Sequence, residues 1–196
     1  MAASQPDKLC FVTVGATASF HLLLQAVLGQ PFLDALYQSG YTHLLVQYGK
    51  DGRSLFEEYL GKTPNRHGIT ISGFDFNHEG LDREMGLTQC SSSENRSGGM
   101  IISHAGSGSI LGALRLGIPL VVVPNPTLKD NHQEDLAHEL QKQGYVVASR
   151  YQDVAAAVER AETLRSQMLT WPPVIGAGKK HRTLDQVMSD EMGFLD

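Results

Sequence analysis

The residues of this chain that are best suited to chemistry lie in one segment, residues 101–140. Its sequence, IISHAGSGSILGALRLGIPLVVVPNPTLKDNHQEDLAHEL, predicts an apolar strand, a glycine and serine turn, a helix, a second apolar strand, a loop bracketed by prolines and another helix. Two helix N-termini therefore follow strand ends in succession. Free backbone N–H groups and positive helix-dipole ends attract anions at such places. We therefore expect a phosphate-bearing ligand here.

The glycine and serine turn begins after a histidine, and its members are His104, Ala105, Gly106, Ser107, Gly108 and Ser109. Its glycines let the backbone approach a diphosphate, and its serines offer hydroxyl donors. The spacing fits neither the dinucleotide-binding pattern, nor a Walker A loop, nor the nucleophile elbow of serine hydrolases. Diphosphate contact is favoured over a purely structural turn. For His104 two interpretations stay open: a hydrogen bond to the ligand phosphate, or a satisfied histidine at a strand end.

The loop bracketed by prolines and the helix after it add amides and a carboxylate. Asp130 or Asn131 is a suitable helix N-cap, and a structural interpretation stops there. However, the loop follows the carboxyl end of a predicted parallel strand, where open α/β sheets bind ligands. Asn131 and Gln133 carry amides suited to sugar hydroxyls, and Glu134 can accept from a hydroxyl of ribose or hexose. The pairing of this loop with the glycine turn favours ligand binding.

A second glycine turn follows the first strand, in the sequence VTVGAT at residues 12–17. Gly15 permits a tight bend of the backbone, and Thr13 or Thr17 could donate to a phosphate oxygen. A structural turn with an N-cap threonine is an equal alternative.

These candidate residues need a scaffold, and apolar runs alternate with helical patterns along the whole chain. Predicted strands cover residues 9–14, 43–47, 69–72, 100–103, 119–123 and 145–148. Predicted helices cover residues 20–36, 55–60, 109–116, 131–142 and 154–164. This alternation favours a mostly parallel sheet with helices on both faces. With right-handed crossovers, it predicts a doubly wound, Rossmann-like α/β fold.

The same alternation of strands and helices predicts one domain over residues 1–166. Within it, residues 77–99 are typical of a mobile insertion loop, because they are rich in serine, asparagine and glycine. Residues 167–196 differ in character, and Trp171-Pro172-Pro173 ends the last predicted helix. We expect this C-terminal tail to pack on the domain or to contact a partner.

Composition narrows the classes of function. The net charge of −5 over 196 residues gives no broad surface for nucleic acid or anionic lipid. Cys10 and Cys90 are too few for a disulfide framework, and no signal peptide or membrane span is recognisable. Histidine and carboxylate spacing matches no metal site. We therefore expect a cytoplasmic protein without nucleic-acid partners, and any membrane attachment through another molecule.

The motifs together resemble a known family. They are FVTVG at 11–15, ISHAGSGS at 102–109, GIPLVVVPN at 117–125 and DNHQ at 130–133. In combination they look like the donor-binding, C-terminal half of a GT-B glycosyltransferase. Over residues 9–158 the chain resembles the small cytosolic subunits of the eukaryotic UDP-N-acetylglucosamine transferase of dolichol-linked oligosaccharide synthesis, in glycosyltransferase family 28. It is more distantly similar to the C-terminal half of bacterial MurG.

This resemblance implies transfer of N-acetylglucosamine (GlcNAc) from UDP-GlcNAc to GlcNAc-diphosphodolichol, with inversion, on the cytosolic face of the endoplasmic reticulum. A membrane-anchored partner subunit would carry the acceptor half. Neither a metal nor a cofactor would be needed, because helix dipoles and N–H donors stabilise the departing UDP. The implied donor-binding residues are Gly15, Thr17, His104, Gly106, Ser107, Gly108, Ser109, Asn125, Asn131, Gln133 and Glu134.

Two departures from the family pattern matter. Relatives often carry an acid that holds the ribose shortly after the glycine turn, where this chain has Gly112, and Glu134 is a possible substitute. Relatives also tend to have an acid after the first strand turn, where this chain has Ser19-Phe20-His21. His21 and His104 are therefore candidate bases, with a base on the partner as the alternative. A non-catalytic nucleotide-sugar-binding or scaffold module, or a GT-B transferase with another acceptor, are the competing functions.

Overall fold

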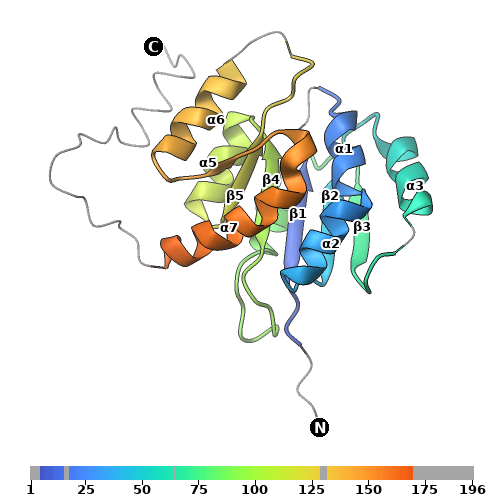
Figure 1. Ribbon diagram of the computed structural model, residues 1–196, viewed down its shortest axis with the longest axis horizontal. Helices are drawn as coiled ribbons and strands as arrows, with labels where there is room; N and C mark the ends of the chain where they lie inside the picture. The colour runs from blue at the N-terminus through green and yellow to red at the C-terminus, as the bar shows by residue number, and fades with distance from the viewer. Residues whose placement is uncertain (1–4, 16–17, 64, 129–131, 170–196) are drawn as a thin grey trace, which may run out of the picture.

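The strands of this protein form one parallel sheet. The computed structural model describes residues 5–15, 18–63, 65–128 and 132–169. Within them the strand order is β3-β2-β1-β4-β5-β6, and every neighbouring pair is parallel (Figure 1). The strands are β1 (Leu9–Thr13), β2 (His43–Gln47), β3 (Thr70–Phe74), β4 (Met100–His104), β5 (Leu120–Val123) and β6 (Val147–Ala148).

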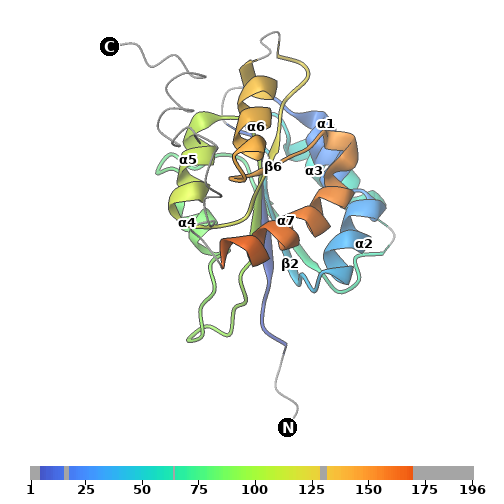
Figure 2. The same ribbon diagram turned by 60° about the vertical axis from the view of Figure 1, so that its left-hand side comes forward.

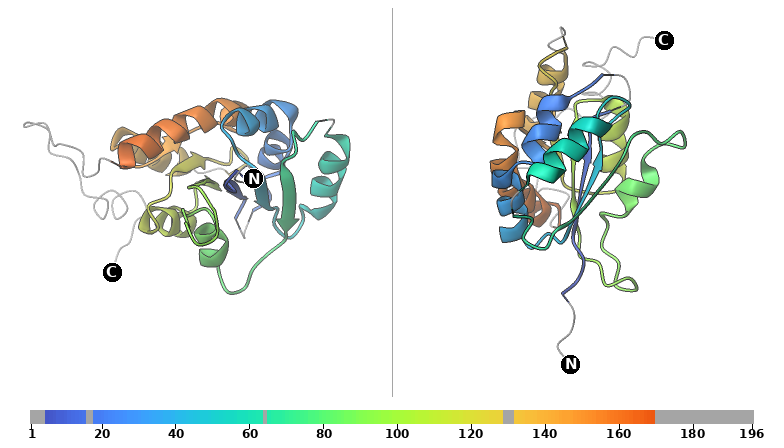
Figure 3. Two further views of the ribbon diagram at one scale, coloured as in Figure 1. Left: turned by 90° about the horizontal axis from the view of Figure 1, so that it is seen from below. Right: turned by 90° about the vertical axis from the view of Figure 1, so that its right-hand side faces the viewer.

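Helices cover both faces of the sheet, as the views from below and from the side show (Figures 2 and 3). They are α1 (His21–Val27), α2 (Gln30–Gln38), α3 (Arg53–Lys62), α4 (Asp82–Gly86), α5 (Ser107–Arg115), α6 (His132–Lys142) and α7 (Val154–Met168), with a 3-10 turn at Tyr151–Asp153. The strand order and the two helical layers are those of a doubly wound fold, so the predicted fold class is confirmed.

The core is divided between the two faces because strand side chains alternate in direction. Cys10, Val12 and Ile102 pack under α1, α2, α3 and α7. Phe11 and Ile101 point the other way and pack under α4, α5 and α6. The inner strands β1, β4 and β5 are therefore buried on both faces, which explains their continuous apolar sequences.

The predicted helix over residues 20–36 is wrong in one respect, because it is two helices. Gly29 is extended, with φ −76° and ψ 151°, and serves as the N-cap of α2. Pro31 follows in the first turn of α2, where its missing N–H costs nothing but prevents continuation from α1. The apolar period runs through this break, which is why periodicity alone predicts one helix.

The predicted insertion segment, residues 77–99, contains the short helix α4, which the sequence did not predict. Its Met85 is 2% exposed and packs with Phe11 and Ile101 on the face of the sheet that α4, α5 and α6 cover. The segment also pairs with the N-terminal residues through a bridge between Asp7 and Arg96. Most of the predicted C-terminal tail, residues 170–196, lies outside the described part of the chain.

The amino end of the sheet carries a polar network that fastens α7. Glu162 accepts a hydrogen bond of 2.6 Å from the Tyr41 hydroxyl and lies 3.0 Å from the Lys8 ammonium. Arg165 donates to Glu162 at 3.1 Å and to the Gly99 carbonyl at 2.6 Å. Helix α7 is thereby connected to the residues that begin β1 and β4.

No helix in the described residues is both long enough and apolar enough to cross a bilayer.

Candidate functional site

The carboxyl ends of the parallel strands share one edge of the sheet, and a cleft opens there beside the predicted glycine turn. This glycine-turn cleft encloses about 410 Å³. It is lined by Gly15, Gln47, Phe76, Asn77, His78, Gly80, Leu81, His104, Gly106, Ser107, Gly108 and Ser109. The structure therefore brings together Gly15 and five predicted residues of the turn at 104–109, which lies about ninety residues away in sequence.

The floor of this cleft is the uncapped N-terminus of α5. Gly106 is extended at the N-cap position and offers no side-chain cap, and the first helical bond runs from the Ile110 N–H to the Gly106 carbonyl. Within the described residues, the N–H groups of Ser107, Gly108 and Ser109 have no partner. Such a row of free donors at the positive end of a helix is suited to bind an anion.

His104 is wedged between the two glycine turns. A Cβ added at Gly15 would lie 2.5 Å from His104 Nε2, and one added at Gly106 would lie 2.2 Å from the same atom. Neither position can accept a side chain while the imidazole stays in place. Gly15 also has φ +87°, a conformation that L side chains rarely adopt. The two glycines are therefore needed to make room for this ring.

The protonation of His104 follows from its burial. Burial lowers the pKa of the imidazole below its usual value, and a hydrogen bond to the Thr13 backbone opposes this only in part. The ring is therefore neutral near pH 7. Its Nδ1 is buried, and no described residue pairs with it. Such a ring supports the shape of the cleft, and its buried nitrogen is poorly placed to act as a general base.

Thr13, which the sequence offered as a phosphate donor, is used inside the protein. Its hydroxyl is fully buried and donates to Gln47 Oε1 at 2.6 Å. The Gly15 N–H also turns inward and shares Thr13 Oγ1 and Gln47 Oε1, each at 3.3 Å. The prediction for Thr13 is therefore wrong. Thr17 lies outside the described residues.

The loop after β5 is organised by Asn125, which is 5% exposed. Its Nδ2 donates to the Ser19 carbonyl at 3.2 Å, and its Oδ1 accepts from the Thr127 hydroxyl at 2.8 Å. Its backbone N–H donates to Gln133 Oε1 at 3.0 Å. Asn125 thus shapes the loop, and the Nε2 of Gln133 keeps its donors free within the described residues. Asn131 lies outside them.

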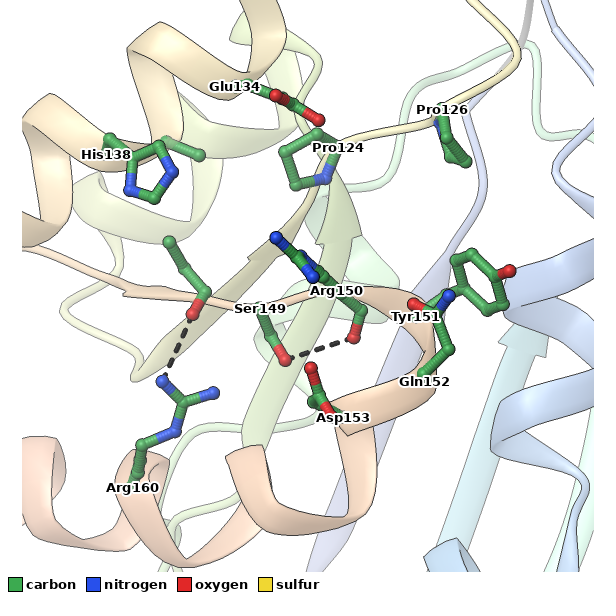
Figure 4. A pocket seen from close by; sticks show the side chains of 12 residues that line it. Pro124, Pro126, Glu134, His138, Ser149, Arg150, Tyr151, Gln152, Asp153 and Arg160 are labelled. Atoms are coloured by element: carbon green, nitrogen blue, oxygen red, sulfur yellow. Dashed lines mark hydrogen bonds between the residues drawn. The ribbon is translucent and has the colours of Figure 1, made fainter.

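Glu134 lines a different cleft, which encloses about 480 Å³ between α6 and the residues after β6. This second cleft is also lined by His138, Arg150 and Arg160. Figure 4 shows Arg150 reaching toward the α6 side, while Arg160 donates to the Ala148 carbonyl at 3.2 Å. Pro124 and Pro126 of the β5–α6 loop also line this second cleft.

Two other predicted positions lie outside both clefts. His21 is the exposed first residue of α1. Gly112 faces α4, because a Cβ added there would lie 3.0 Å from Met85 Sδ and 3.9 Å from Asp82 Oδ1. The short helix α4 therefore occupies the space beside Gly112 and brings an acid close to it.

The sequence did not single out Gln47 or residues 76–81 as part of the cleft. The available signal was Asp75, Asn77 and His78, polar residues that directly follow the third strand at the same sheet edge as the glycine turns. Asn77 and Glu84 pair at 3.2 Å behind this wall. The described residues contain no cluster of three or more metal-ligating side chains.

Comparison with known proteins identifies the family. The model of the glycosyltransferase family 28 C-terminal domain matches residues 9–169. The UDP-N-acetylglucosamine transferase subunit ALG13 of Cryptococcus neoformans is 37% identical, covering 93% of this chain and 96% of its own. The protein of the same name from Yarrowia lipolytica is 31% identical, covering 92% of this chain and 85% of its own.

Solved structures agree with this. A solution NMR structure of ALG13 superposes with a TM-score of 0.62 at 29% identity, covering 81% of this chain and 87% of that one. Acinetobacter baumannii MurG matches in fold, with a TM-score of 0.51 at 19% identity over 42% of its length. With a family model and curated relatives that cover most of its length, the protein belongs to glycosyltransferase family 28, is a glycosyltransferase, and falls among the UDP-N-acetylglucosamine transferase subunits.

Proposed function

We propose that this chain is the donor-binding subunit of the transferase that adds the second GlcNAc to GlcNAc-diphosphodolichol. The observation that carries this proposal is the row of free N–H groups at Ser107, Gly108 and Ser109, which opens into the glycine-turn cleft. The names of the relatives supply the donor, UDP-GlcNAc, and indicate that the chain works as a subunit.

The diphosphate of UDP-GlcNAc lies on the N-terminus of α5 in this proposal. The hydroxyls of Ser107 and Ser109 add donors, and Gly108 leaves open space, because a Cβ there meets nothing within 4 Å. The nucleoside enters the cleft along residues 76–81, and the sugar extends toward Gln133 and Glu134. Thr17 and Asn131 remain proposed contacts from the adjoining segments.

The reaction is a single displacement with inversion. The acceptor hydroxyl attacks the anomeric carbon of GlcNAc, the bond from that carbon to the UDP oxygen breaks, and a base takes the hydroxyl proton. Negative charge grows on the departing diphosphate, and the free N–H groups at the positive end of α5 stabilise it there without a metal.

The catalytic base is proposed to come from the partner. His104 is neutral, but its Nδ1 is buried, and His21 lines neither cleft. A membrane-anchored partner that carries the acceptor site would supply the base and recruit this subunit to the cytosolic face of the endoplasmic reticulum. The partner would also bind the lipid.

The experiment that tests this proposal separates binding from transfer. Calorimetry should show UDP-GlcNAc binding by the isolated full-length chain, and transfer to GlcNAc-diphospholipid should require addition of membranes that contain the partner. Binding without transfer under all conditions would favour the non-catalytic module. Transfer by the chain alone, or transfer only to another acceptor, would reject the split-enzyme proposal.

A further inference from the structure

Gln47 is a buried amide at the last residue of β2, and it makes four hydrogen bonds. It is 2% exposed. Its Oε1 accepts from the Thr13 hydroxyl at 2.6 Å and from the Gly15 N–H at 3.3 Å. Its Nε2 donates to the Gly15 carbonyl at 3.2 Å and to the Asp75 carbonyl at 2.9 Å. Both donors and the acceptor of the amide are therefore satisfied within the protein.

The position of Gln47 explains these contacts. In the sheet β2 lies between β1 and β3, and Gln47 pairs in register with Thr13 on one side and Phe74 on the other. Its side chain extends past the strand ends and reaches the first residues of both following loops. These loops form the two walls of the glycine-turn cleft, with Gly15 on one side and residues 76–81 on the other.

The glycine turn at Gly15 is thereby held from two directions. Gln47 binds both its N–H and its carbonyl from the β2 side. The His104 ring lies against the turn from the β4 side, because a Cβ added at Gly15 would lie only 2.5 Å from His104 Nε2. The separation of the cleft walls therefore depends on one amide, whereas the floor depends on α5.

We propose that Gln47 is a positioning residue that sets the width of the glycine-turn cleft and thereby the affinity for the nucleotide-sugar. This inference rests on the proposed function for the identity of the ligand. Only an amide can accept from Thr13 and Gly15 and at the same time donate to two carbonyls. A side chain of equal length without N–H donors leaves the Gly15 and Asp75 carbonyls unpaired, so the two walls separate.

The test uses Gln47→Glu in the full-length chain, with UDP-GlcNAc affinity measured by calorimetry at pH 8 and pH 5. At pH 8 the carboxylate faces two carbonyls, and we expect affinity about tenfold below wild type, since two hydrogen bonds are lost. Burial and these carbonyls raise the pKa of the introduced acid. At pH 5 its protonated form donates one hydrogen bond, so the ratio to wild type should fall to about threefold or less.

Tyr41→Phe is the control, because it removes a partly buried hydrogen bond at the opposite end of the sheet. It should lower the melting temperature and leave the affinity within about twofold of wild type. If Gln47→Glu is unfolded at pH 8, Gln47→Met replaces it and should show a weakening of about tenfold at both pH values.

Wild-type affinity in either folded variant overturns the role of Gln47. An equal ratio for Gln47→Glu at both pH values also overturns it, because simple distortion has no pH dependence. Absence of UDP-GlcNAc binding by the wild-type chain instead rejects the proposed function, so the two failures are distinguishable.

Discussion

At the amino end of the sheet, Glu162 accepts hydrogen bonds from Tyr41 and Arg165 and pairs with Lys8, whereas at the carboxyl end polar groups are left open. The described residues contain three buried side-chain polar atoms without a partner. Two of them, His104 Nδ1 and Glu84 Oε2, lie in or directly behind the glycine-turn cleft. The α5 N–H groups beside them are also free.

The comparison indicates different roles for the two ends of the sheet. The amino end contributes to stability, and the carboxyl end is the proposed binding site. Paired charges at the amino end hold α7 in place and contribute to the free energy of unfolding. Open donors and unpaired groups at the carboxyl end cost stability, and in the proposed function the open donors supply binding energy for an anion. Substitutions at the two ends should therefore affect different measurements.

The largest expected effect on stability is at the amino end. Glu162→Ala leaves Lys8 and Arg165 without their carboxylate in a site where the Glu162 side chain is only 27% exposed. We expect the free energy of unfolding to fall by about 2–3 kcal/mol, measured by urea denaturation. The UDP-GlcNAc affinity of the folded fraction should not change.

Glu159→Ala is the matched control on the same helix, because its side chain is exposed. It should change stability by less than about 0.5 kcal/mol. An equal loss in both variants would show that α7 is sensitive to any substitution, and the network would lose its assigned role.

The second substitution lies at the carboxyl end of the sheet, where the main expected effect is on ligand affinity. Gly106→Ala places a Cβ 2.2 Å from His104 Nε2, so the ring and the turn must move apart. We expect UDP-GlcNAc affinity to fall by about 10- to 100-fold, because the N–H groups of α5 are displaced. Stability should also fall, by about 1–3 kcal/mol, so the loss of affinity is the measurement that separates this variant from Glu162→Ala.

The control for this substitution is Gly61→Ala in α3, where an added Cβ meets nothing within 4 Å. It should leave affinity unchanged. Unchanged affinity in Gly106→Ala would mean that the diphosphate does not lie on this turn.

The sequence predicts the scaffold of the site better than its interior. Strand 43–47 is observed with the predicted bounds, because an apolar run between polar turns has few other solutions. Gln47 could not be recognised, since a glutamine at a strand end also fits an exposed terminus. Its importance comes from Thr13 and Asp75, which only the folded sheet brings to it.

The division of the predicted site between two clefts could not be predicted from the sequence either. Gln133 and Glu134 are neighbours in sequence, and both suit a sugar hydroxyl. Glu134 nevertheless lies across from Arg150, because the edge strand β6 ends beside α6. Such placement depends on contacts between distant segments, which residue types and spacing do not encode locally.

A third prediction uses acid pH to separate the two ends. Burial lowers the pKa of His104, so the unfolded chain takes up a proton below about pH 6.5 before the folded chain does. Stability should therefore fall as pH drops below that value, by at most about 1.4 kcal/mol per pH unit. His104→Gln should remove this phase from a series of urea denaturations between pH 8 and pH 5.

Glu162 responds at lower pH. Burial raises its pKa, but hydrogen bonds from Arg165, Tyr41 and Lys8 outweigh burial and leave the pKa below its ordinary value. Its contribution is present above about pH 4.3 and is lost as pH falls through the lower, folded value. Glu162→Gln should remove only this second phase. Hydrogen bonds from Gln30 and His67 also lower the pKa of Asp34. Because Asp34 contributes at acid pH as well, each variant is compared with wild type. Loss of both phases in one variant would contradict the separation of the two ends.

The smallest expected effect concerns the sugar end of the proposed site. In the proposed complex, the sugar of UDP-GlcNAc reaches the first turn of α6, where the Nε2 of Gln133 has no partner within the described residues and Glu134 lines the second cleft. Gln133→Ala and Glu134→Ala should each weaken UDP-GlcNAc binding by about three- to fivefold, the loss of one hydrogen bond. Binding of UDP should stay unchanged, because UDP lacks the sugar.

Asp135→Ala is the control for helix charge. Asp135 is an exposed acid in the same helical turn, and it lines neither cleft. If Gln133→Ala weakens UDP-GlcNAc and Glu134→Ala does not, the donor sugar ends at the loop, and the second cleft with Arg150 is open to the acceptor side of the reaction.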